Sequence, residues 1–239
     1  MWGRSLELGG EASASSIYVV SIPASSPVSA SEQAYLTVKE LIVTGELPGG
    51  ELVSEGDIAG RMDVSRTPVR EAFLRLQAEG WMRLYPKRGA LVVPIAPGEA
   101  EHIVSARWIV ETASVRSVVR DERARIQLLA DLRSNLECQL SLVETGTAAE
   151  FSAADADFHR LIVRAAGNPL LDEFYTGLRE RQRRMTAHSL IRDPGQISRI
   201  VDDHAELADL IEAGDVDGFA DAVEQHMNRV HGLTEGVRK

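Results

Sequence analysis

The chain has 239 residues, a formal net charge of -10 and a hydrophobic fraction of 44%, which exclude wholesale disorder and permit a packed core. Its single cysteine excludes an internal disulfide framework, a cysteine-based zinc finger and an iron–sulfur cluster. The sequence has no apolar run of about 18 residues, so no membrane span is expected. The first thirty residues lack the basic start and apolar stretch of a signal peptide. A cytoplasmic protein is therefore expected.

The N-terminal part predicts a flexible extension followed by a small helical unit. Residues 1–30 are rich in Ser, Ala and Gly and are expected to be flexible. Capping residues and turn residues predict helices over 31–44, from Ser54, and from Ser65 to Gly80, and strands over 82–85 and 90–93. Prolines at 94 and 97 mark a boundary. Residues 31–95 are thus predicted to form a winged helix-turn-helix of three helices and a two-stranded wing.

The rest of the chain, residues 96–239, predicts helices alone. Thr147 and Glu150 have the spacing of a capping box, and Asn168 and Asp193 each precede a proline at the expected first helical position. The predicted helices cover residues 98–120, 122–144, 147–166, 169–188, 194–213 and 215–233. The predicted fold class is therefore mainly α, with an all-α antiparallel helical bundle after the winged helix-turn-helix.

A local basic patch lies within this acidic chain. Residues 59–91 hold seven basic and three acidic side chains, whereas residues 96–239 hold seventeen basic and twenty-five acidic ones. The third helix begins with exposed-face residues Arg66, Thr67 and Arg70, opposite the apolar stripe of residues 69, 73 and 76. The first turn of a recognition helix contacts base edges and phosphates. Isolated arginines of this kind are also ordinary solvated helix residues, so the combined pattern carries the DNA-binding interpretation.

The tip of the predicted hairpin adds a second group of candidates. Lys87 and Arg88 supply positive charge there, and Gly89 permits a close approach of the backbone to DNA. The residues that resemble a known family are Leu47-Pro48-Gly49-Gly50, Ser54-Glu55, Val64-Ser65-Arg66-Thr67-Pro68-Val69-Arg70-Glu71-Ala72, Glu79-Gly80-Trp81 and Gly89.

This stretch resembles the N-terminal domain of GntR-family transcriptional regulators. The resemblance implies a homodimer on a pseudo-palindromic double-stranded DNA operator. It also implies base contacts from Arg66, Thr67 and Arg70 and a minor-groove contact from the wing. Gly56 departs from the family, because related proteins often carry a longer DNA-contacting residue there.

Four polar residues are predicted to face the interior of the bundle. Asp155 and His159 are four residues apart on one helix face, and His204 and His226 belong to the apolar stripes of two later helices. Imidazole and carboxylate groups together are typical ligands of transition metals. Inward histidines are also common as hydrogen-bonded core residues, and the residues alone leave both interpretations open.

The helical part resembles the FCD branch of the GntR family, through the following residues: Arg107 and Glu111, Asp155-Ala156-Asp157-Phe158-His159, Gly167-Asn168-Pro169-Leu170, Asp203-His204 and Gln225-His226. The resemblance implies an effector-binding and dimerisation domain in which Asp155, His159, His204 and His226 bind a divalent transition metal. Zinc is favoured, with nickel, manganese and iron as alternatives. A small organic or sugar acid is then expected as the effector, with Arg107 and Asn168 as candidate contacts. An ion pair between Arg107 and Glu111, and helix capping by Asn168, are the competing interpretations.

The leading hypothesis is a metabolite-responsive transcriptional regulator, a repressor rather than an enzyme. The alternative is a metal-dependent enzyme that uses the Asp and three His to activate water or oxygen. No further inward general base accompanies the motif, which disfavours that alternative. A third reading, an architectural DNA binder, conflicts with the acidic total charge.

Overall fold

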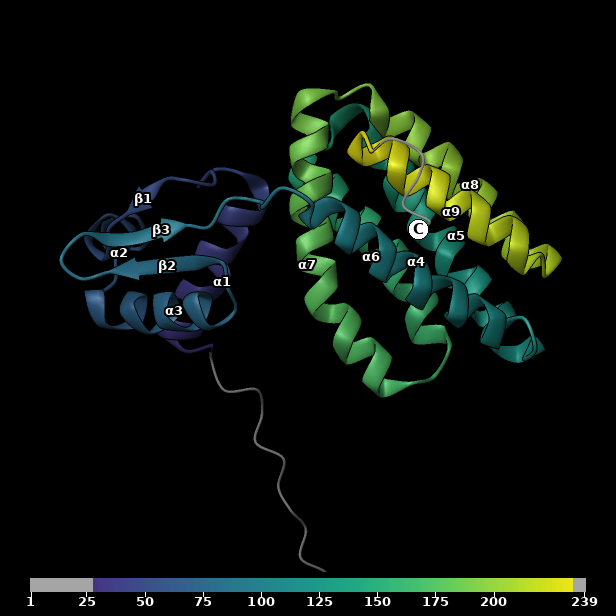
Figure 1. Ribbon diagram of the computed structural model, residues 1–239, viewed down its shortest axis with the longest axis horizontal. Helices are drawn as coiled ribbons and strands as arrows, with labels where there is room; N and C mark the ends of the chain where they lie inside the picture. Colours follow the sequence, from purple (N-terminus) through teal and green to yellow (C-terminus); the bar gives the residue numbers. More distant parts are fainter. Residues whose placement is uncertain (1–27, 234–239) are drawn as a thin grey trace, which may run out of the picture.

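The structure is a computed structural model that describes residues 28–233, and two parts of different architecture follow each other along the chain (Figure 1). The predicted flexible extension, residues 1–30, lies outside the described residues except for its last three. The N-terminal part contains α1 (Ala30–Thr44), β1 (Leu52–Val53), α2 (Glu55–Met62), α3 (Arg66–Ala78), β2 (Met82–Tyr85) and β3 (Gly89–Val92).

The starts of these helices follow their capping residues. The Ser29 and Ser54 hydroxyls accept hydrogen bonds from the backbone N–H groups of Glu32 and Asp57 at the first turns of α1 and α2. Ser65 stands at the N-cap of α3 as predicted, but its side chain makes no capping bond. Gly45 ends α1 in the left-handed conformation, with φ 84°.

The wing contains one strand more than predicted. β2 and β3 form the expected antiparallel hairpin, and β1 pairs with the outer side of β3 through Leu52↔Leu91 and Val53↔Ala90. A strand of two residues shows no alternation of apolar and polar positions, so the sequence offered no period from which to predict it. The predicted two-stranded wing is therefore a three-stranded sheet.

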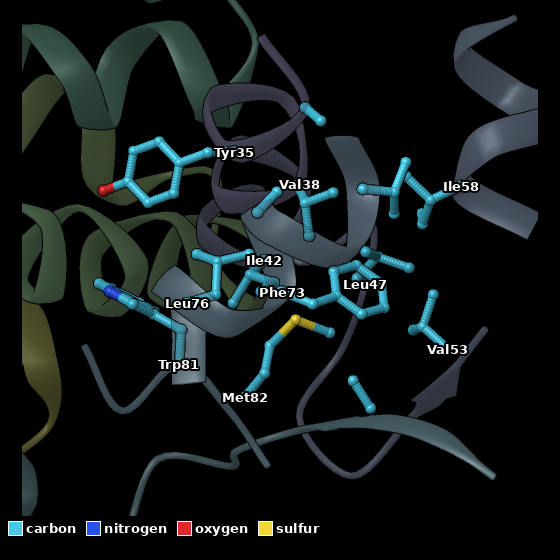
Figure 2. Packing of buried hydrophobic residues seen from close by; sticks show 14 of the residues in the cluster. Tyr35, Val38, Ile42, Leu47, Val53, Ile58, Phe73, Leu76, Trp81 and Met82 are labelled. Carbon is cyan, nitrogen blue, oxygen red and sulfur yellow. The ribbon is translucent and has the colours of Figure 1, made fainter. Parts of the chain in front are cut away.

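One apolar core holds the N-terminal part together. Figure 2 shows Phe73 and Leu76 of α3 packed among Ile42 of α1 and Met82 of β2, with Trp81 beside them. The first four of these side chains are at most 2% exposed, and Trp81 is 6% exposed. This packing fixes the orientation of α3, so the opposite face of α3 has a defined position on the surface.

The second part is a bundle of long helices, as predicted. Its helices are α4 (Glu99–Val118), α5 (Glu122–Thr145), α6 (Ala148–Ala165), α7 (Pro169–Arg192), α8 (Gln196–Ala213) and α9 (Val216–His231). Thr147 and Glu150 form the predicted capping box, and Asn168 caps α7 before Pro169. The predicted fold class, mainly α with an N-terminal winged helix-turn-helix, is confirmed. No helix within residues 28–233 is long and apolar enough to cross a bilayer.

The boundary between α7 and α8 differs from the prediction. The prediction placed Asp193 before a helix that starts at residue 194, whereas Asp193 is the residue that ends α7 and α8 starts at Gln196. The Asp193 carboxylate accepts a hydrogen bond from the backbone N–H of Gly195, within a short turn. Asp before Pro fits both a helix start and a turn, and α7 is four residues longer than predicted because apolar Leu190 remains buried in the bundle.

Phe73→Ala should open the N-terminal part by removing the centre of its core. We expect the free energy of unfolding of the N-terminal part to fall by about 3–5 kcal/mol, because truncation of a buried phenylalanine leaves a cavity. The measurement is the opening free energy of α1 and α3 amides by hydrogen exchange. Leu74→Ala is the matched control: Leu74 is the next residue on α3 and is 50% exposed, so its effect should stay within about 0.5 kcal/mol. Equal effects of the two changes would contradict the assignment of this core.

Candidate metal centre and nucleic-acid interface

The first turns of α3 present the predicted DNA-contacting residues on the surface. Arg66, Thr67 and Arg70 are exposed, whereas Val69 and Phe73 on the other face are buried. A Cβ atom at Gly56 would lie 3.4 Å from Nη2 of Arg66. The Arg66 side chain therefore lies beside the space in which a longer residue at position 56 would project.

The tip of the wing carries two exposed basic side chains, Lys87 and Arg88. Lys87 has φ 62°, a left-handed conformation that turns the chain between β2 and β3. Gly89 begins β3 with φ 102°, and a Cβ atom there would collide with the carbonyl oxygen of Val53. Glycine at this position is thus required by the packing of β1 on β3, whatever the wing contacts.

The four predicted metal ligands come together in the bundle. Asp155 and His159 project from α6, His204 from α8 and His226 from α9, and one potential ligand atom of each lies within 4.8 Å of those of the other three. All four side chains belong to residues that are at most 2% exposed. The i, i+4 spacing on α6 and the inward stripes of α8 and α9 produce this convergence.

Each histidine is oriented by a hydrogen bond at its Nδ1 atom. Nδ1 of His159 lies 2.8 Å from Oε2 of Glu111, that of His204 lies 2.9 Å from Oε1 of Gln139, and that of His226 lies 3.0 Å from Oδ2 of Asp203. An acceptor at Nδ1 places the proton there and leaves Nε2 as a lone-pair donor.

The Nε2 atoms of two of these histidines face each other. The Nε2 atoms of His159 and His204 are 3.2 Å apart, and Nε2 of His204 is 3.6 Å from Oδ1 of Asp155. The Phe158 ring stacks on the His204 ring, with centroids 4.2 Å apart, and fixes its plane. Lone pairs of several ligands that converge in this way are what a metal ion requires.

The other oxygen of Asp155 is held by α7. Oδ2 accepts hydrogen bonds from Nε2 of Gln182, at 3.0 Å, and from the hydroxyl of Thr186, at 3.2 Å. The carboxylate is therefore positioned through one oxygen while the other faces His204. Buried ligand carboxylates are commonly oriented by hydrogen bonds of this kind.

Arg107 and Tyr175 complete the polar interior. Nε of Arg107 lies 2.9 Å from Oε1 of Glu111, and the Tyr175 hydroxyl donates to the same oxygen at 2.5 Å. The predicted Arg107–Glu111 ion pair is thus present, and both residues are buried. Nη2 of Arg107 is also buried, and no group among residues 28–233 accepts its hydrogen bond. An unpaired guanidinium nitrogen is a candidate contact for an anionic ligand.

Burial shifts the pKa values of two histidines in the direction that favours metal binding and shifts that of Asp155 in the opposite direction. Burial, reinforced by the charge of Arg107, lowers the pKa of His159 well below its ordinary value. The pKa of His204 is likewise lowered well below its ordinary value by burial and by His226. These two imidazoles are therefore neutral near pH 7, the state that binds metals. Burial raises the pKa of Asp155 although Arg107 opposes the change, so a cation beside this carboxylate would stabilise its charged form.

The structure separates one predicted residue from the others. The Asn168 side chain is exposed and accepts hydrogen bonds from the backbone N–H groups of Leu170 and Leu171 at the start of α7. Helix capping accounts for it, as in the competing interpretation, and we omit it from the candidate effector site.

Sequence reasoning missed Gln139, Tyr175, Gln182 and Thr186. Each lies on a helix other than those that supply the four ligands, and each contacts the site only through helix packing. Their residue types are common at solvated helix positions. The one signal in the sequence was the i, i+4 spacing of Gln182 and Thr186, which places both on one face of α7.

Comparisons with known proteins assign both parts of the chain. The model of the FCD domain matches residues 102–229, and the model of bacterial regulatory proteins of the gntR family matches residues 30–92. An HTH-type transcriptional regulator of Streptomyces ambofaciens is 28% identical, over 85% of this chain and 84% of its own length. The gluconate operon transcriptional repressor of Bacillus licheniformis is 28% identical, over 82% of this chain and 81% of its own.

Solved structures share the fold. Escherichia coli McbR/YncC superposes with a TM-score of 0.71 at 23% identity, covering 85% of this chain and 95% of that one. A GntR regulator of Rhodococcus gives a TM-score of 0.69 at 20% identity, covering 86% and 99%. Both matched domains are those of transcriptional regulators and not of enzymes. The chain belongs to the GntR family of DNA-binding transcriptional regulators and carries the FCD domain.

Proposed function

We propose that this regulator is a homodimeric transcriptional repressor whose affinity for its operator depends on a small organic or sugar acid bound at a divalent metal. The buried cluster of Asp155, His159, His204 and His226, with an outer partner for every histidine, carries this proposal. Relatives support the repressor role, since one is named a gluconate operon repressor and another a probable D-xylose utilization operon repressor.

The donor set supports zinc as the metal. Three imidazoles and one carboxylate are donors of intermediate hardness, which suit Zn²⁺ and also Ni²⁺, Mn²⁺ or Fe²⁺. Four protein ligands leave open positions on an ion of coordination number five or six, and a carboxylate oxygen fits such a position. The unpaired Nη2 of Arg107 is our candidate for the second contact to that carboxylate.

The exposure and positive charge of side chains on α3 and the wing support DNA binding. In a dimer, two copies of α3 would enter successive major-groove faces about 34–36 Å apart. Arg66, Thr67 and Arg70 would contact bases and phosphates, and Lys87 and Arg88, with Gly89 at the base of the wing tip, would approach the minor groove. These residues are exposed except for Gly89, and the α3 side chains among them project away from the core.

Zinc affinity should depend on the outer partner of His204. In Gln139→Leu, Nδ1 of His204 loses its acceptor, so we expect Zn²⁺ to bind about 10–100-fold more weakly. The measurement is competition with a chromophoric chelator. Gln127→Leu is the matched control, because Gln127 is an exposed glutamine on the same helix, α5, and it should keep the original affinity. A Gln139 variant that binds zinc as tightly as the control would contradict the orienting role.

DNA binding should fail when the first turns of α3 lose their charge. A DNA fragment is first selected from a random library by the protein, and its affinity is then measured by fluorescence anisotropy. Arg66→Ala and Arg70→Ala should each weaken binding, by about 1–3 kcal/mol if the lost contact is to a base, with zinc content unchanged. Arg133→Ala removes an exposed arginine of α5 and should bind DNA normally. Normal binding by both α3 variants would refute the recognition-helix assignment.

Ligand-dependent stabilisation should require the metal. We expect one class among organic and sugar acids to raise the Tm of the zinc-loaded protein. A ligand at a hundred times its Kd adds about 2.7 kcal/mol to the free energy of unfolding. The shift should vanish after chelation and in His204→Ala. The neutral amide or alcohol analogue of each acid, which lacks the carboxylate charge, is the chemical control. A shift that persists without metal would place the ligand elsewhere, and the absence of any shift would refute an acid effector.

A further inference from the structure

One turn of α7 contacts both the candidate metal centre and the N-terminal part of the chain. We define residues 181–186 as the coupling turn. Gln182 and Thr186 donate hydrogen bonds to Asp155, whereas Arg183 and Arg184 reach α1 and the segment after β3. Residues four apart share a helix face and their immediate neighbours lie around the helix from it. Arg183 therefore lies beside the face that holds Asp155 and Arg184 lies opposite it, and Figure 1 shows α7 on the side of the bundle nearest α1.

The contact with α1 is a two-pronged ion pair. Nη2 and Nη1 of Arg183 lie 2.7 Å and 3.0 Å from Oε1 and Oε2 of Glu40. Glu180, one turn earlier on α7, lies 3.3 Å from Nη1 of Arg183 and holds the guanidinium from the helix side. Bidentate pairs of this kind fix direction as well as distance. A rotation or shift of the coupling turn therefore changes where α1 is held.

The second contact of the coupling turn holds the segment that follows β3. Nη2 of Arg184 donates to the carbonyl oxygen of Val93 at 2.9 Å. A Cβ atom at Gly49 would lie 2.7 Å from Cα of Pro94, so this segment is also packed tightly on the loop after α1. The coupling turn thus contacts the N-terminal part both at α1 and at the segment after β3.

Two polar atoms of the coupling turn lack the hydrogen-bond partners that buried polar atoms usually have. Oε1 of Gln182 and Nε of Arg183 are buried, and no group in residues 28–233 forms a hydrogen bond with either. A buried polar atom without a partner is unfavourable, because it has lost its hydrogen bonds to water. A rearrangement of the turn that gave either atom a partner would remove this unfavourable contribution.

We propose that the coupling turn transmits the state of Asp155 to the DNA-binding part, an inference that rests on the metal site of the proposed function. Any change in how the Asp155 carboxylate is held alters the hydrogen bonds of Gln182 and Thr186, and the rigid helix moves Arg183 and Arg184 with them. Operator affinity and zinc affinity then depend on each other through one turn of helix. Such coupling is reciprocal and typically amounts to a factor of about 5–150.

The test is a thermodynamic cycle on the full chain. DNA fragments are selected with both zinc-loaded and metal-free protein, and the Kd for DNA is measured in each state. For the original protein, we expect the two Kd values to differ at least about fivefold. In Glu40→Gln, which removes the charge partner of Arg183, the ratio should approach one, while zinc affinity without DNA stays unchanged. DNA should change the zinc affinity of the original protein by that same factor.

The matched control lies on the same helix. Asp172→Asn breaks the ion pair between Arg160 of α6 and Asp172 of α7, in which Nε and Oδ1 are 3.0 Å apart. This ion pair does not involve Glu40 or Val93. The Asp172 variant should keep the original ratio. Thr186→Val removes a hydrogen bond on the Asp155 side of the coupling turn and should lower the ratio with the Glu40 pair intact.

The outcomes separate this inference from the proposed function. A Glu40→Gln variant that keeps the original ratio overturns the route through α7 and leaves the metal site and DNA binding in place. Zinc binding that leaves DNA affinity unchanged in the original protein also overturns the inference and leaves the metal site in place. A chain that binds DNA and no zinc overturns the metal site and the coupling together.

Discussion

The interior of the bundle is organised around charged and polar groups that are withdrawn from water. Asp155, Glu111, Arg107 and the histidines at 159 and 204 are each at most 1% exposed. Burial of such groups is strongly unfavourable unless each finds a partner. Their hydrogen-bond partners come from five helices, α4 to α8, so these helices must pack in one register for the site to be satisfied. Apolar side chains then fill the space around this polar centre in three separate clusters.

In this buried setting, the hydrogen bonds at the three Nδ1 atoms decide which nitrogen of each histidine is available to a metal. A buried imidazole with an unfixed tautomer can present either nitrogen to its neighbours. Glu111, Gln139 and Asp203 each occupy Nδ1, which directs the lone pair of Nε2 away from these partners. Glu111 also accepts hydrogen bonds from Arg107 and Tyr175, which oppose the rise in its pKa that burial causes. The cluster is thereby preorganised for a ligand-binding role.

The sequence predicted the parts of this site that local periodicity determines. Asp155 and His159 share a helix face by spacing alone, and the apolar stripes of α8 and α9 identify the inward side of His204 and His226. The sequence could not predict the roles of Gln139 and Tyr175. The role of Gln139 depends on how α5 packs on α8, and that of Tyr175 depends on how α7 packs on α4. The same limit applies to β1, whose two residues become a strand only by pairing with β3. Asp193 was misassigned because an Asp-Pro pair is compatible with a helix start and with a turn.

Several of the contacts between the two parts are polar. Glu40 remains 48% exposed at its side chain in the pair with Arg183, and partly exposed pairs contribute little net stability. Arg181 and Arg184 add cation–π contacts to Trp81, with the guanidinium carbons 5.8 Å and 5.9 Å from the ring centroid. Such contacts define the orientation of the N-terminal part on the bundle but add little net stability to it. A coupling free energy of about 1–3 kcal/mol is therefore sufficient to change the preferred orientation.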